Sequence, residues 1–178
     1  MNNYQSRRVF VNREQSLHWR IKGLTWFFII GLVLSGVTAI PLVPELGWVA
    51  TFFGVNSTTL IPYDQGFRGW IWEIWTSLQE TNYQHPFLFY GTDWLAFGHF
   101  MIALVFVGAL RDPVRNRWLF DFGLMACVLV VPYAFVFGGL RGIPVWWRLI
   151  DCSFGVVGFL PLWFCRRWAL ELEQRNKN

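Results

Sequence analysis

Residues 118–137 read WLFDFGLMACVLVVPYAFVF, a run of 20 residues in which Asp121 is the one charged side chain. About 20 consecutive apolar residues form a helix long enough to cross the hydrocarbon core of a bilayer. Three further stretches have the same character, at 24–43, 93–110 and 145–165. We therefore expect an all-α, polytopic membrane protein with four transmembrane helices.

The composition of the whole chain also favours a protein that lies in a lipid bilayer. Of the 178 residues, 54% are hydrophobic, 20% are aromatic and 15% are charged. Soluble domains carry about 25% charged residues, so a soluble enzyme, a disordered chain and a nucleic-acid module are all disfavoured. The lipid bilayer is the expected partner, and no nucleic acid is expected.

The four stretches divide the chain into one membrane domain, 1–178, with three polar parts. A basic tail precedes the first span, at 1–22, and a charged tail follows the last, at 166–178. A long connection, 44–92, joins the first span to the second. The short turn before Pro144 predicts that the third and fourth helices are antiparallel neighbours.

Basic residues predict the orientation of the chain. Twelve of the 15 Lys and Arg residues fall in 1–22, 111–117 and 166–178, which lie on one side of the membrane if there are four spans. Cytoplasmic segments carry the excess of Lys and Arg. We therefore expect a multi-pass protein of the cell membrane with both termini cytoplasmic and 44–92 outside.

The outer connection contains an amphipathic pattern. Residues 67–78 read FRGWIWEIWTSL. In a helix, the apolar positions of this segment share one face, and they are Phe67, Ile71, Ile74, Trp75 and Leu78. We expect an amphipathic helix that lies on the outer leaflet or caps the bundle, and a similar piece at 46–53.

A few ionisable groups fall inside the spans, where each needs a partner or a cavity. His99 and Asp151 each lie roughly 9 Å from the outer end of their span, at 1.5 Å per residue. Arg148 shares a helix face with Asp151, and Tyr133 and Trp147 lie in the same outer half. These five residues are the predicted ligand-binding set of a polar pocket in the outer leaflet half.

Such a pocket supports two chemistries. Arg148 can bind a carboxylate or phosphate headgroup while aromatic walls hold an apolar remainder. His99, oriented by Asp151, can act as a general acid or base, so these two residues are the candidate catalytic residues. The plainer alternatives are a histidine that is only a hydrogen-bonded packing residue, and an ion pair of Arg148 with Asp151, within one helix or between helices. Whether the protein is an enzyme is left open.

Two functions therefore follow from the residues. In the first, the protein binds, or acts on, a lipid-like amphipathic small molecule. In the second, it is a structural or accessory subunit of a larger membrane complex, or a homo-oligomer, with no chemistry of its own. The small size and the absence of a full catalytic motif favour the second.

Histidines raise the question of a haem. His18-Trp19-Arg20 precedes a span that contains Leu34-Ser35-Gly36, and this resembles the four-helix cytochrome b subunits of dehydrogenases. The resemblance implies a b-type haem or a quinone. However, His18 falls at the inner face and His99 toward the outer face, so the two do not ligate one haem. No cofactor is expected.

The cysteines do not indicate a metal site. Cys127, Cys152 and Cys165 each lie in or at the edge of an apolar stretch, and none forms a C-x-x-C pair. Zinc sites and disulfide frameworks usually show such spacings. No metal is therefore expected.

Overall fold

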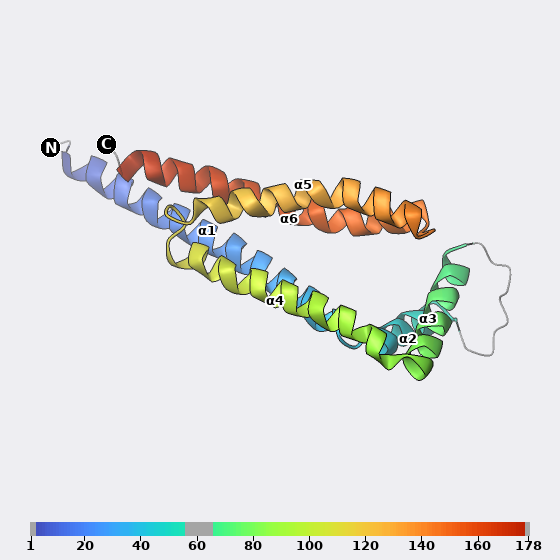
Figure 1. The fold of residues 1–178 in the computed structure, drawn as a ribbon. Coiled ribbons are helices and arrows are strands. Elements are labelled where there is room, and N and C mark those ends of the chain that lie inside the picture. The colour runs from blue at the N-terminus through green and yellow to red at the C-terminus, as the bar shows by residue number, and fades with distance from the viewer. Residues whose placement is uncertain (1–2, 56–65, 177–178) are drawn as a thin grey trace. The chain divides into compact units, whose positions relative to one another are not determined.

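The computed structural model describes residues 3–55 and 66–176, and this part of the chain is all-helical (Figure 1). The elements are α1 (Asn3–Ala39), α2 (Leu42–Phe52), α3 (Phe67–Gln84), the 3-10 helix η1 (Pro86–Phe89), α4 (Tyr90–Arg111), α5 (Arg117–Leu140) and α6 (Val145–Asn176). The expected all-α class is confirmed.

Four helical segments are long and apolar enough to cross a membrane. They are Arg13–Ala39, Pro86–Arg111, Arg117–Leu140 and Val145–Arg175. The last three each contain one of the apolar stretches seen in the sequence. The first ends four residues before the end of its predicted stretch, 24–43. In the most apolar window of α5, only 17% of the residues are buried inside the protein. Helices with so much exposed apolar surface are typical of membrane proteins.

The first span was predicted to run to Val43, but α1 ends at Ala39. Pro41 lacks a backbone N–H, and a proline biases the residue before it away from helical geometry. A new helix, α2, begins at Leu42, and Pro44 is tolerated in its first turn because N–H groups there have no helical partner.

The chain forms two compact units, and each is described separately. The first comprises 1–31 and 103–178, and the second comprises 32–102. The helices α1 and α4 therefore contribute residues to both units. The expectation of one four-span domain stays a prediction.

In the first unit, α6 packs against both α1 and α5. Buried residues recur every fourth position along α1, at Leu17, Ile21, Thr25 and Ile29. The Thr25 hydroxyl donates to the carbonyl of Ile21 at 2.7 Å and lies 3.8 Å from the sulfur of Cys165 on α6. Positions three and four apart on a helix share a face, so α1 presents one continuous stripe to α6.

The matching stripe on α6 has the alternating three and four spacing of a coiled-coil seam. Its buried positions are Gly155, Gly158, Leu162, Cys165, Ala169 and Leu172. The stripe continues beyond residue 165, where the predicted span ended. This packing explains why the tail after the fourth span remains helical. The basic segment before the first span is also helical, and it packs through the stripe on α1.

In the second unit, α2 and α3 pack around a small core. Ala50, Val55 and Ile71 are fully buried there, and Trp75 packs against them. The indole nitrogen of Trp75 lies 3.2 Å from where a Cβ at Gly47 would stand, so a small residue is needed on α2. The amphipathic helix expected at 67–78 exists and extends to Gln84. Part of its apolar face is covered by α2.

Candidate functional site

Arg148 lies in the first turns of α6 and folds back over the turn that connects α5 to α6. Its Nε donates to the carbonyl of Ile143 at 2.7 Å. A Cβ at Gly138 would stand 2.9 Å from the Arg148 side chain, so the arginine packs directly on the α5 backbone. Gly142 completes the turn at φ +70°, a left-handed conformation that favours glycine. Arg148 therefore fastens the end of the helix pair at which α5 turns into α6.

Asp151 follows Arg148 by three residues and is half-buried. No ion pair forms between the two, although the structure describes both residues. The reason is that the guanidinium is turned back toward Ile143. The alternative of a simple Arg148–Asp151 ion pair is therefore wrong for these two described residues.

His99 lies on α4, within the second unit, and is half-buried. Its Nδ1 lies 2.8 Å from the carbonyl oxygen of Leu95, one turn earlier in the same helix. The contact agrees with the plainer alternative, a hydrogen-bonded packing histidine, and the bond lies within its own helix. Because Asp151 belongs to the first unit, the pairing of His99 with Asp151 stays a prediction.

The two predicted aromatic members contact other aromatic rings. Tyr133 is 64% exposed, and its ring centroid lies 4.5 Å from that of Phe137. The ring of Trp147 lies edge-on to Trp146 at 5.6 Å. Such amphipathic rings suit the boundary between lipid and water, where one end is apolar and the other is wet.

A groove between α5 and α6 was not found by sequence analysis. Its volume is about 430 Å³. All of its lining residues are apolar, and they are Cys127, Val128, Val131, Pro132, Gly155, Val156, Phe159 and Leu160. The sequence signals were Pro132 inside a helix and Gly155 on the facing helix.

Gly155 explains why the groove exists. A Cβ at this position would stand 2.7 Å from the carbonyl oxygen of Cys127, so the backbones of α5 and α6 approach closely here. Small residues allow such an approach where lipid provides no hydrophobic driving force between helices. Pro132 lacks an N–H, which leaves the carbonyl of Val128 without its usual helical partner. The two features give a close contact beside an open, apolar space.

The groove leads toward the two polar residues on α6. Asp151 precedes Gly155 by one turn, and Arg148 precedes it by seven residues, roughly 10 Å along the helix. Seven residues are nearly two full turns, so Arg148 and Gly155 share a face. The arrangement is an apolar slot with a carboxylate and a guanidinium beyond one end, which suits a molecule with an apolar body and a polar head.

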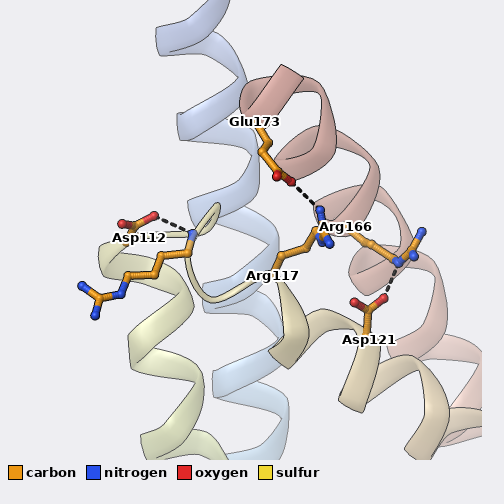
Figure 2. A network of polar contacts seen from close by, with 6 residues as sticks. Asp112, Arg117, Asp121, Arg166 and Glu173 are labelled. Carbon is orange, nitrogen blue, oxygen red and sulfur yellow. Dashed lines mark hydrogen bonds and ion pairs between the residues drawn. The ribbon is translucent and has the colours of Figure 1, made fainter. Parts of the chain in front are cut away.

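The opposite end of the helix pair carries a network of charges (Figure 2). Arg117 at the start of α5 pairs with Glu173, and Asp121 pairs with Arg166 on α6. Asp121 is the one charged side chain of its apolar stretch, and its partner lies 45 residues later in the chain. This partner was not predictable from the local sequence.

A second group of charges joins α1 to α6. Glu171 accepts from Arg13 at 3.0 Å and from Arg175 at 2.9 Å. Its carboxylate therefore joins the polar end of α1 to that of α6. In the link before α5, the Asp112 carboxylate accepts from the backbone N–H of Arg115 at 2.9 Å, which caps a short turn (Figure 2).

The described residues contain no group of three or more His, Cys, Asp or Glu side chains placed to hold a metal ion. The three cysteines are free thiols. Comparisons of the chain with protein-family models, curated proteins and solved structures find no match.

Proposed function

We propose that the chain is a multi-pass protein of the cell membrane with both termini in the cytoplasm and the 44–92 connection outside. The charge network supports this orientation. Contacts of Arg13 and Arg117 with the carboxylates of α6 bring the start of α1, the start of α5 and the end of α6 to one end of the first unit. These are the segments in which Lys and Arg concentrate, as the positive-inside rule requires.

Within this orientation, the protein binds one lipid-like amphipathic molecule between α5 and α6, with its polar head toward their outer end. The observation that carries the proposal is the apolar groove of about 430 Å³ that leads toward Asp151 and Arg148. Small-molecule sites have volumes of about 300 to 1,000 Å³, with mostly apolar walls and few polar groups. The groove holds the apolar body, and the polar residues of α6 select the head.

Arg148 is suited to an anionic head. Its Nε is anchored on Ile143, while no described residue accepts from its terminal nitrogens. A guanidinium held in this way offers two parallel donors to a carboxylate or phosphate with little loss of side-chain entropy. Asp151 accepts from a hydroxyl or amine of the same head. His99 is not needed for binding in this scheme.

Filling the groove tests the proposal. Val128 lines it, and Leu129 is the next residue on α5, does not line it and is 58% exposed. The variants Val128→Trp and Leu129→Trp are purified from their native membrane in mild detergent, and bound molecules are identified by native mass spectrometry. We expect Val128→Trp to lose at least about tenfold of the bound ligand, corresponding to about 1.4 kcal/mol, while Leu129→Trp retains it.

The proposal is wrong if the wild-type protein carries no bound molecule, or if the two variants retain equal amounts. Circular dichroism and size-exclusion chromatography establish that both variants are folded. The two substitutions add the same side chain to neighbouring positions of one helix. A difference between them therefore reports occupation of the groove rather than a general effect of tryptophan.

A second candidate is a subunit of a larger membrane complex. It is favoured by the small buried share of the four spans, 17% to 28% of the residues in their most apolar windows. Large aromatic side chains are also exposed on α2, with Trp48 at 74% and Phe52 at 81%. Purification from the native membrane would then give a complex larger than the 20.9 kDa chain. A lone monomer contradicts this candidate.

A further inference from the structure

Five side chains of α1 and α6 form a continuous row with a cation at each end. The members in order are Arg20, Trp168, Phe164, Trp163 and Arg167. The Arg20 guanidinium lies 5.9 Å from the Trp168 ring, and that of Arg167 lies 5.6 Å from Trp163. Phe164 joins the two indoles, with centroid distances of 5.5 Å to Trp168 and 5.0 Å to Trp163. All five belong to the first unit.

The two cations of the row differ from their neighbours. Arg166, one residue away, pairs with Asp121, and Arg13 pairs with Glu171. In contrast, Arg20 and Arg167 are exposed and form no ion pair with any residue that the structure describes. The row therefore presents two positive charges that the described protein does not neutralise.

The row lies at the depth of lipid headgroups. Counted from Val145, where α6 begins, Trp163 lies about 27 Å and Trp168 about 35 Å along the helix at 1.5 Å per residue. The hydrocarbon core is about 30 Å thick. The aromatic rings thus span the boundary between acyl chains and headgroups at the end proposed above to be cytoplasmic, with 39% of Trp163 and of Phe164 exposed.

We propose that this row, Arg20–Trp168–Phe164–Trp163–Arg167, binds the headgroup of an anionic phospholipid of the cytoplasmic leaflet. Guanidinium groups form paired hydrogen bonds with phosphate oxygens. The rings between them pack against the glycerol and upper acyl region. A lipid fits better than an acidic protein segment because the exposed rings of Trp163 and Phe164 reach the boundary with the acyl chains, where a lipid offers both charge and apolar contact. The leaflet named here depends on the proposed orientation of the chain.

The stacking prepares the arginines for binding. A guanidinium held over an aromatic face keeps its N–H edges free for an anion. Its side chain has also lost part of its conformational freedom before the lipid arrives, which lowers the entropic cost of binding. We therefore expect the affinity for the lipid headgroup to depend on the stacking of the row as well as on its charge.

The test uses the full chain in vesicles of phosphatidylcholine with one tenth phosphatidylglycerol. Protein is released in mild detergent, and native mass spectrometry counts the phosphatidylglycerol that remains bound. The row variant is Arg20→Gln with Arg167→Gln. The control is Arg111→Gln with Arg115→Gln, which removes the same charge from two exposed arginines, one at the end of α4 and one in the link to α5. We expect about tenfold less bound phosphatidylglycerol in the row variant, and less than a twofold change in the control.

A second variant, Trp168→Leu, keeps both charges and removes the ring that joins Arg20 to Phe164. We expect several-fold less phosphatidylglycerol to remain bound. The proposal is overturned if row and control variants lose lipid equally, or if all variants retain it. Both sides of these vesicles contain the same lipids, so the result does not depend on orientation. It is also independent of the groove, which Val128→Trp tests separately.

Discussion

The two ends of the α5–α6 pair are fastened by different means. At the end proposed to be cytoplasmic, side-chain charges meet in pairs, Arg117 with Glu173 and Asp121 with Arg166. At the other end, Arg148 instead donates to a backbone carbonyl and packs on glycine. Between the two ends, Gly155 brings the backbones together.

The difference follows from the surroundings of each end. The charge pairs retain 31% to 42% side-chain exposure, and exposed pairs contribute about 0 to 1 kcal/mol each. At the Gly155 contact, by contrast, two backbones meet in an apolar environment, where no water can solvate groups that the contact loses. We therefore expect the free energy of unfolding to depend most on the glycine contact, less on Arg148 and least on the ion pairs.

The largest effect is expected for Gly155→Ala. The added Cβ would stand 2.7 Å from the carbonyl oxygen of Cys127, and because this atom belongs to the backbone it does not move away easily. Overpacking of this kind costs about 1 to 3 kcal/mol. The measurement is thermal unfolding in detergent. Gly23→Ala is the matched control because a Cβ there meets nothing within 4 Å. Equal stability of the two variants contradicts the close contact.

A smaller effect is expected for Arg148→Leu. The change removes the hydrogen bond to Ile143 and leaves its carbonyl unsatisfied, at a cost of about 1 to 2 kcal/mol. Arg141→Leu, at an exposed position of the same turn, serves as the control and should change stability by less than about 0.5 kcal/mol. If the two variants unfold at the same temperature, Arg148 does not fasten the turn.

The smallest effect is expected for Glu171→Gln, which removes the charge that Arg13 and Arg175 share. We expect a loss of about 1 kcal/mol at low salt. Because salt screens exposed charges, the difference from wild type should shrink at 1 M salt. Glu14→Gln, on α1, controls for a change in net charge. A loss that does not change with salt argues against an electrostatic role of Glu171.

The four long apolar helices were predictable because a run of about 20 apolar residues is visible in the sequence alone. The amphipathic pattern of 67–78 likewise predicted α3, since its apolar positions repeat within one segment. The helical tails were missed because their stability comes from contacts distant in the sequence. Leu17 and Ile21 on α1, and Leu172 on α6, were the signal that the packed stripe continues beyond the predicted spans.

The candidate site was harder to predict. Depth along a helix placed Arg148 and Asp151 near each other, but the acceptor of Arg148 is a backbone carbonyl, which no side-chain pattern reveals. The groove depends on how closely α5 and α6 approach, and this distance is determined by Gly155 together with its neighbour across the interface. How closely the two helices approach is a property of the folded chain, and neither helix sequence reveals it alone.

The central claim is a four-span topology with both termini inside. Single cysteines at Ser16, Arg115, Gln174 and Gln79, in a background that lacks the three native cysteines, report it through labelling of whole cells with a membrane-impermeant maleimide. The account predicts that Gln79→Cys is labelled from outside, whereas the other three are labelled only after the membrane is permeabilised. External labelling of one terminus and not the other would contradict it.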